Sequence, residues 1–529
     1  MGKITPFFYI ISGLWFLNFH TVWAAPPSAE ALYEQHCGQC HSADRLGHTG
    51  PALLPESLKR LPFKQTLATI RSGLSATQMP AFGEQLTSTE IESIAHYIYT
   101  SPAVSPNWPE DAIRNSRIVH HPELLKLEAA ALKPVYEADP LNLFLIVETG
   151  DHHVTVLDGD SITPIHRFKS RYALHGGPKY TANGRYVYFA SRDGWISKFD
   201  MYQLKTIVEV RAGINTRNLA VSDDGRYVMV ANYLPHTLVM LDAHDLRLIQ
   251  VIPVTNDAGK TSRVSAVYTA PPRQSFIAAL KDFKQIWEIH YSDNPPPVYQ
   301  GYVHDYRMGE GLADRSRFPI RKIQLDDVLD DFFFDQNYEH IIGASRKAQQ
   351  GQVVNLIVGR KIADLDLAGM PHLGSGITWP YITPEGQQTT VLVTPNLKLS
   401  LINVIDMSTW RVIKKIPTKG PGFFIRSHEN SPYAWIDVFF GPNRDLMHIL
   451  DKKTLEIVKT LKPRPGKTST HVEFTRDGRH ALLSIWDTEG EVIAYDSHSL
   501  KETKHLPMSK PVGKYNVYNK ISRSEGTSH

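Results

Sequence analysis

The chain has 529 residues, of which 42% are hydrophobic and 21% are charged, and its formal net charge is +3. This length is too great for a single ordinary domain, and the composition is that of a globular rather than a disordered protein. A charge this close to neutral, without a basic run, gives no indication of nucleic-acid binding, so we expect no such partner.

Residues 1–25 are predicted to be a secretory signal peptide. Lys3 is the only charged residue, an apolar stretch runs from Phe7 to Phe19, and small residues follow at Ala24 and Ala25. This order is typical of a signal peptide with its cleavage site. An uncleaved membrane anchor is the alternative, but the apolar stretch is shorter than the roughly 20 residues that span a bilayer. We therefore expect a periplasmic protein without a membrane span after cleavage.

Residues 26–104 are predicted to form a small all-α c-type cytochrome domain. The two cysteines of the chain, Cys37 and Cys40, are followed by His41 in the C-x-x-C-H pattern of covalent haem attachment. Two thiols three residues apart on a helical turn reach both vinyl groups of one porphyrin, and the histidine then faces the iron. A redox cysteine pair or a zinc site is the alternative, but no second cysteine pair exists to complete a zinc site. The sequence thus predicts one covalent haem c.

The second axial ligand of this haem is predicted to be Met79. It lies in the segment MPAF, which resembles the methionine loop of small c-type cytochromes, and a thioether is a common partner of a haem-binding histidine. A buried core methionine is the alternative interpretation. His48 is a competing ligand, but it lies too near His41 in the sequence to reach the opposite haem face easily.

Helical patterns flank these ligands. Residues 29–36 lead into the cysteines, and residues 88–99 begin with a Ser/Thr cap and place Ile91, Ile94, Ala95 and Ile98 on one face. The proline-rich segment SPAVSPNWPED then begins a linker, which we place at residues 105–136.

Residues 137–529 are predicted to form an all-β propeller of eight blades. Short β-type runs recur at a spacing of roughly 40–45 residues, which is typical of propeller blades. Each clear repeat ends a strand with an apolar residue and an aspartate: Asp158, Asp200, Asp242, Asp406, Asp451 and Asp496. Strand ends near Ile289 and Leu356 complete the count of eight if residues 301–325 are an insertion within a blade. We expect this insertion to serve as a lid or as a surface for a partner. A pair of β-sandwiches is the alternative, but it does not explain the fixed period.

Histidines and arginines recur near the starts of these repeats, where the mouth of a central channel is expected. Each alone is an ordinary structural residue or a solvated charge. Together they fit an iron tetrapyrrole with several carboxylates, because imidazoles bind iron and guanidiniums pair with carboxylates. The candidates are His175, Arg192, Arg217, Arg263, Arg346, His372, Arg426, His428 and His471.

A C-x-x-C-H cytochrome followed by an eight-bladed propeller resembles the cytochrome cd1 family over nearly the whole chain. The segments LDDVLDDFFFDQ, LAGMPHLGSGITW, GPGFFIRSHENSPYAW and KPVGKYNVYNKISRSEGTSH look closest to NirF, a protein of haem d1 biosynthesis. NirF normally lacks a cytochrome domain, so the fusion departs from that pattern. NirN, which has both domains, and the cd1 nitrite reductase are the other relatives.

The resemblance implies roles for individual residues. His175 matches the proximal ligand of the d1 iron, and His372 matches one of two distal histidines of the reductases. The other distal histidine would fall near Phe334, which has no proton to give. Arg192 and Arg217 resemble arginines that bind the carboxylates of haem d1.

The resemblance also implies a function in late haem d1 assembly, with a d1 precursor or haem d1 bound non-covalently in the propeller. Oxidation of a side chain, such as a propionate to an acrylate, requires a base, for which His428 and His471 are the candidates. The electrons would leave through the macrocycle to haem c. Expected partners are the precursor, other d1 biosynthesis proteins, the cd1 reductase and periplasmic electron-transfer proteins; the dimeric reductases imply a homodimer. The alternatives are a nitrite reductase and a non-enzymatic d1 carrier.

Overall fold

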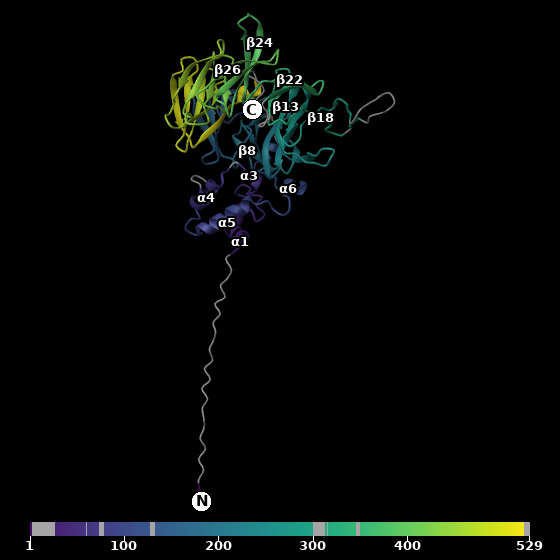
Figure 1. Ribbon diagram of the computed structural model, residues 1–529, viewed down its shortest axis with the longest axis vertical. Coiled ribbons are helices and arrows are strands. Elements are labelled where there is room, and N and C mark those ends of the chain that lie inside the picture. The colour runs from purple at the N-terminus through teal and green to yellow at the C-terminus, as the bar shows by residue number, and fades with distance from the viewer. Residues whose placement is uncertain are drawn as a thin grey trace.

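The computed structural model describes residues 1–2, 27–59, 61–73, 79–126, 133–299, 313–314, 316–344 and 350–522. They form a small helical domain that lies against one face of a ring of β-sheets, as Figure 1 shows. Residues 3–25 of the predicted signal peptide lie outside the described residues. None of the helices within these ranges is both long and apolar enough to cross a bilayer.

The helical domain contains the haem-attachment pattern. Its helices are α1 (Ala29–His36), α2 (Gly38–His41), α3 (Pro55–Leu58), α4 (Phe63–Ser72) and α5 (Ser88–Tyr99). Thr87 and Glu90 form a capping box that starts α5, each side chain bonding to the other's backbone N–H. The predicted apolar face of α5 is confirmed, because its four residues are buried against Leu32 and Tyr33 of α1.

The segment after this domain lies along the ring. It contains α6 (Glu110–Asn115), β1 (Ile118–Val119) and α7 (Pro122–Lys126), within the predicted linker 105–136. Strand β1 adds a fifth strand to a blade by pairing with β8 (Lys205–Arg211) in antiparallel register. Ile113 and Leu124 are buried against the same blade. The segment is therefore packed against the propeller by its own apolar side chains.

The described residues form eight sheets of four main strands each, which confirms the predicted eight-bladed propeller. The blades of the first half are blade 1, with β35 (Pro511–Asn516), β2 (Leu143–Glu148), β3 (His153–Asp158) and β4 (Thr163–Lys169); blade 2, with β5 (Lys179–Tyr180), β6 (Tyr186–Ala190), β7 (Trp195–Asp200) and β8; blade 3, with β9 (Asn215–Val221), β10 (Tyr227–Leu234), β11 (Thr237–Asp242) and β12 (Leu248–Pro253); and blade 4, with β13 (Val264–Ala270), β14 (Ser275–Leu280), β15 (Gln285–His290) and β18 (Ile320–Gln324).

The blades of the second half follow the same order from the axis outward. They are blade 5, with β19 (Asp331–Phe334), β20 (His340–Ala344), β21 (Gly351–Asn355) and β22 (Arg360–Leu365); blade 6, with β23 (Ile377–Ile382), β24 (Gln388–Pro395), β25 (Leu401–Asp406) and β26 (Arg411–Pro417); blade 7, with β27 (Ile425–Arg426), β28 (Tyr433–Asp437), β29 (Met447–Asp451) and β30 (Glu456–Leu461); and blade 8, with β31 (Thr468–Phe474), β32 (His480–Trp486), β33 (Glu491–Asp496) and β34 (Glu502–Pro507).

The aspartates that marked the repeat share one structural position. Each of the six ends the third strand of its blade, as Asp200 ends β7 and Asp406 ends β25. Their carboxylates accept hydrogen bonds from backbone N–H groups two or three residues on, as Asp406 does from Ser408, so the aspartate fixes the turn into the fourth strand. The outer strand of a blade such as β22 alternates in exposure along its length, whereas a middle strand such as β21 is buried over most of its length.

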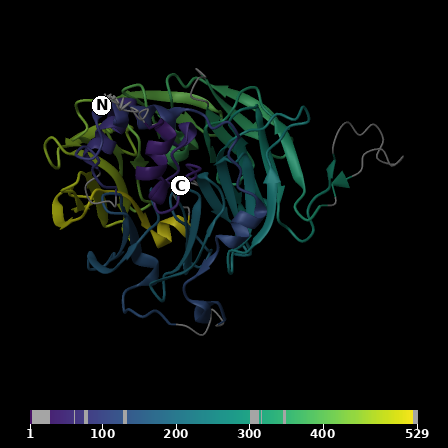
Figure 2. The same ribbon diagram turned by 90° about the horizontal axis from the view of Figure 1, so that it is seen from below.

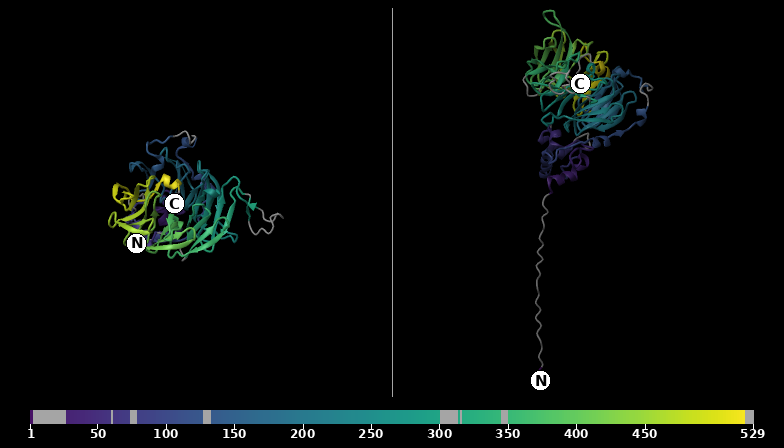
Figure 3. Two further views of the ribbon diagram at one scale, coloured as in Figure 1. Left: turned by 90° about the horizontal axis from the view of Figure 1, so that it is seen from above. Right: turned by 90° about the vertical axis from the view of Figure 1, so that its right-hand side faces the viewer.

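The chain closes the ring with its C-terminal strand. Strand β35 pairs with β2, so blade 1 takes its innermost strand from the end of the chain and its other three from the beginning of the propeller. Helix α8 (Val517–Ser522) follows, and Val517 is buried against the start of the propeller. Figures 2 and 3 place this yellow C-terminal segment toward the middle of the ring.

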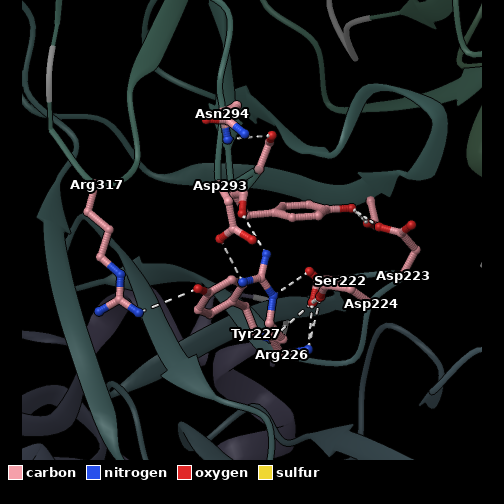
Figure 4. A network of polar contacts seen from close by, with 11 residues as sticks. Ser222, Asp223, Asp224, Arg226, Tyr227, Asp293, Asn294 and Arg317 are labelled. Atoms are coloured by element: carbon pink, nitrogen blue, oxygen red, sulfur yellow. Dashed lines mark hydrogen bonds and ion pairs between the residues drawn. The ribbon is translucent and has the colours of Figure 1, made fainter.

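The predicted insertion at residues 301–325 is too wide, because its last part is β18, the fourth strand of blade 4. The described part also contains β17 (Ala313–Asp314), which pairs with β16 (Val298–Tyr299). Figure 4 shows two contacts that blade 3 makes near this segment: Arg226 binds Asp293 at 2.8 Å, and Arg317 donates to Tyr227 at 3.4 Å.

Candidate functional site

The haem-attachment residues lie together at the start of α2. Cys37 and Cys40 are both free thiols, and His41 is buried. The Nδ1 atom of His41 lies 2.8 Å from the carbonyl oxygen of Pro51, so Nδ1 carries the proton and Nε2 keeps its lone pair for iron. Burial lowers the pKa of His41, which keeps the imidazole in the neutral form that a metal requires.

The space around these ligands fits a haem. One cavity of about 2510 Å³ is lined by Cys37, Cys40, His41 and Met79, and by the apolar side chains of Leu58, Ile70, Phe82, Ile94 and Ile98. Gly50 forms a close wall, because a Cβ atom there would lie 2.7 Å from Cε1 of His41. These residues would hold a covalent haem c, with His41 and Met79 as the candidate ligands of its iron.

The same cavity continues to the propeller. Its walls include residues of the blade connections on the face next to the helical domain: Arg192, Tyr233, Arg263, Lys281 and Asp330. The rings and cations are close here, since the guanidinium carbons of Arg192 and Arg263 lie 5.8 and 5.7 Å from the ring centre of Tyr233. Arg263 also forms an ion pair with Asp282 at 2.5 Å.

Three of the predicted channel residues meet at the inner ends of blades 2 and 3. His175 Nδ1 lies 2.8 Å from the carbonyl oxygen of Arg217. Its Nε2 lies 2.9 Å from Nη2 of Arg192 and 3.0 Å from Nη1 of Arg217. A nitrogen that faces two guanidiniums is an acceptor, so the imidazole is neutral with its lone pair on Nε2.

His372 lies across the axis, in the connection that leads into blade 6. Its Nδ1 lies 2.7 Å from the carbonyl oxygen of Phe423, and its Nε2 lies 3.9 Å from a carboxylate oxygen of Asp331. Burial lowers the pKa of His372, although Asp331 opposes the shift. Phe334 is buried in the core between blades 4 and 5, with its ring centre 4.9 Å from that of Tyr338.

Arg426 and His471 come from the innermost strands of blades 7 and 8. His471 is the extra residue of a β-bulge, because Thr470 pairs with Ser484 and Val472 pairs with Leu483. Its φ of +43° is in the left-handed region, and a bulge of this kind redirects one side chain. The ring centre of His471 thus lies 4.7 Å from that of Phe424 and 5.4 Å from that of Tyr515.

Positive charge surrounds His471. Burial, together with the cations of Lys514, Arg426 and Lys520, holds the pKa of His471 well below its usual value. Lys514 is fully buried and donates to Ser484 Oγ at 2.6 Å and to the carbonyl oxygen of His471. Burial and Arg426 likewise lower the pKa of Lys520, in α8, to about 7.

The structure does not place every predicted site residue beside the histidines and arginines of the channel. His428 follows β27 at the opposite end of the strand from Phe424, and its Nδ1 accepts from the backbone N–H of Asn430 at 3.1 Å. Its ring packs near Phe474 and closely under Gly478, where a Cβ atom would lie 2.3 Å from Nδ1. Arg346 lies outside the described residues.

The sequence interpretation missed several groups of the channel. Asp331 accepts from the hydroxyl of Tyr268 at 2.9 Å and faces His372, and Lys520 reaches inward from the last helix. Asp331 begins the innermost strand of blade 5, where the repeat marker is weak. Lys520 lies beyond the last repeat. Neither position carried a signal that a repeat-based search could have found.

The fold and the two sites define a class of protein: a c-type cytochrome joined to an eight-bladed propeller whose channel gathers histidines and arginines. Residues 138–520 match the model of the cytochrome d1 haem domain, and residues 24–98 match that of cbb3-type cytochrome c oxidase subunit III. The chain belongs to the cytochrome d1 haem domain family, with a cytochrome c domain at its N-terminal end.

The relatives correct one expectation. A dihydro-haem d1 dehydrogenase from Pseudomonas aeruginosa is 52% identical over 96% of this chain and 97% of its own length. A solved structure described as dihydro-haem d1 dehydrogenase NirN in complex with DHE has a TM-score of 0.85, 52% identity, and coverage of 93% of this chain and 99% of that chain. NirF of Pseudomonas aeruginosa is only 25% identical over 70% of this chain and 90% of its own. The prediction that NirF is the closest relative is therefore wrong.

Proposed function

We propose that this chain is a dihydro-haem d1 dehydrogenase, a periplasmic oxidoreductase of late haem d1 biosynthesis. The 52% identity to a dihydro-haem d1 dehydrogenase, which extends over both domains, carries this proposal. The continuous cavity supports it, because one space joins the residues of the haem c site to the mouth of the propeller. A dehydrogenation removes two hydrogen atoms, so two electrons and two protons must leave the substrate.

The channel residues are suited to hold an iron tetrapyrrole. His175 and His372 are neutral imidazoles from opposite parts of the ring, and in each of them Nδ1 donates to a backbone carbonyl oxygen, so Nε2 carries the lone pair that an iron ion requires. Coordination by His175 requires Arg192 and Arg217 to turn away from Nε2. The two guanidiniums would then be available to pair with the acidic side chains of the same substrate, because a guanidinium can bind a carboxylate through two hydrogen bonds.

His471 is the candidate base that the geometry favours. Its depressed pKa keeps the imidazole unprotonated at neutral pH, and the guanidinium of Arg426 nearby attracts an anionic substrate. His428 is also neutral for reasons of burial, but its ring packs near Phe474 rather than beside Phe424 and Tyr515, where the ring of His471 lies. We therefore assign proton removal to His471 and a structural role to His428.

Haem c supplies a one-electron acceptor when it is bound. The two electrons would leave the substrate one at a time, so the haem c domain would have to be reoxidised between them, by a periplasmic electron-transfer protein or by a second, oxidised copy of the chain. The haem-attachment residues and Arg192, which contacts His175, line one cavity, so the two sites adjoin each other.

The test is conversion of dihydro-haem d1 by the holoprotein with a one-electron acceptor and without oxygen. We expect a product that has lost two hydrogen atoms, and acceptor reduced at two equivalents per product. Return of unchanged dihydro-haem d1 would identify a carrier instead. Rapid consumption of nitrite by protein loaded with haem d1 would identify a nitrite reductase.

A further inference from the structure

Arg211 joins the helical domain to the propeller by a set of contacts that no other described side chain duplicates. Its Nη1 donates to the carbonyl oxygen of Gly47 at 3.1 Å, and its Nη2 donates to that of Leu46. On the propeller side its Nε donates to the carbonyl oxygen of Asp193 at 2.9 Å. Arg211 as a whole residue is 5% exposed, and its guanidinium carbon lies 4.6 Å from the ring centre of Trp108.

These contacts lie on a short route between the two sites. The backbone N–H of Gly47 donates to the carbonyl oxygen of His41, the haem ligand, at 2.9 Å. At the other end, Asp193 is bonded directly to Arg192, whose Nη2 lies 2.9 Å from Nε2 of His175. Without substrate, the series of covalent and hydrogen bonds runs from His41 through Gly47, Arg211 and the Arg192–Asp193 peptide to His175. When Arg192 turns from His175 to pair with a carboxylate of the substrate, the series ends on the substrate itself.

We infer that Arg211 is a positioning residue for electron transfer between the propeller site and haem c. Electrons tunnel more readily through bonds than across gaps, and Arg211 is the one side chain that bridges the domain boundary on this route among the described residues. Its bonds use a charged donor and are largely buried, so they are stronger than neutral surface bonds. This inference rests on the proposed function, in which electrons travel from the bound tetrapyrrole to haem c.

Burial adds to the rigidity of this bridge. Asp193 is buried, and burial raises the pKa of its carboxyl, while Arg211 partly offsets the shift. The neighbouring apolar contact between the domains contains Ala52 and Leu54 on one side and Ile214 and Leu234 on the other. That contact holds the domains together without Arg211, so removal of the guanidinium should leave the domains docked.

The experiment is single-turnover mixing of oxidised holoprotein with dihydro-haem d1, with haem c reduction followed by absorbance. We expect Arg211→Met to slow this reduction at least tenfold while the affinity for dihydro-haem d1, the haem c spectrum and the haem c potential stay unchanged. Arg211→Gln retains one donor, so an intermediate rate is expected; it also serves if the Met variant does not fold.

Two further variants separate the bridge from simple docking. Arg117→Met removes a guanidinium of the linker that donates to a propeller carbonyl oxygen, that of Asp245 at 2.7 Å, away from the route. This variant should keep the wild-type rate. Trp108→Phe removes the indole bond to the Arg211 carbonyl oxygen but keeps the guanidinium, so it should also stay near wild type. A rate for Arg211→Met within twofold of wild type, or an equal loss in Trp108→Phe, would overturn the inference. Failure of the wild type itself to reduce haem c would refute the proposed function instead.

Discussion

The lowered pKa of Lys520 predicts that the affinity for the substrate depends on pH. Its ammonium belongs to the last helix and points toward Arg426, Glu473 and Lys179, with Nζ 5.4 Å from the ring centre of Tyr515. Burial is the main reason that its pKa falls from the usual 10.5 to about 7. Without a ligand, Lys520 is therefore mostly neutral above pH 7.

A bound carboxylate favours the charged form of Lys520 and raises its pKa toward the usual value. Binding then takes up a proton above pH 7, and affinity falls as the pH rises. If the full pKa is restored, the dissociation constant for dihydro-haem d1 increases about 50-fold between pH 7 and pH 9, with uptake of about 0.9 proton at pH 8. The substrate carboxyl groups are already ionised in this range and add no slope.

The assay is fluorescence or absorbance titration with dihydro-haem d1 at several pH values, together with calorimetry in two buffers of different ionisation enthalpy to count protons. Lys520→Met should bind more weakly at pH 7 and lose the slope. Lys504→Met is the matched control. Lys504 lies on β34, the outer strand of blade 8, and donates to the carbonyl oxygen of Ser161, so this variant should keep the slope. A constant affinity in the wild type, or the same slope in Lys520→Met, would refute the reasoning.

Three shorter predictions follow from the haem site, the base and the core. Gly50→Ala places a Cβ atom 2.7 Å from Cε1 of His41, so the imidazole ring must shift. Redox titration should then show a changed haem c potential. An unchanged potential and spectrum would count against His41 as the iron ligand. His471→Gln should bind dihydro-haem d1 normally but convert it roughly 10²–10⁴-fold more slowly in single-turnover mixing, the range for loss of a general base; unimpaired conversion would remove His471 from the mechanism. Leu145→Ala empties a fully buried site beside the closing strand, and denaturant unfolding should show a loss of about 2–5 kcal/mol, whereas a loss below about 1 kcal/mol would contradict the described closure.

The blade repeat and the haem ligands were readable from the sequence because each depends on local chemistry. An aspartate such as Asp406 caps the turn after a third strand, so the same residue type recurs wherever the turn does. The C-x-x-C-H pattern is likewise complete within five residues. The prediction of eight blades therefore held even where the markers weaken in blades 4 and 5.

The composition of the channel was less readable because its residues come together only through the closed ring. His175 and Arg217 are in contact although 42 residues separate them, and Asp331 faces His372 from the neighbouring blade. His428 and His471 look alike in the sequence. The bulge at His471 distinguishes them, because it directs that ring toward Phe424 and Tyr515.

The choice of NirF as the closest relative failed for a related reason. All the segments that supported it came from the propeller, which NirF shares with the other members of the family. The match to a dihydro-haem d1 dehydrogenase at 52% identity extends through the haem domain as well, over 96% of the chain. The joint presence of both domains is the more informative feature, because NirF normally lacks the cytochrome domain.

The most direct test of the account is an electron count in the absence of any external acceptor. Fully oxidised holoprotein in excess over dihydro-haem d1 should show reduction of two haem c groups for each haem d1 formed, as measured by absorbance under anaerobic conditions. Formation of haem d1 while haem c stays oxidised would contradict the account, because the electrons would then have left by a path that does not include the attached cytochrome.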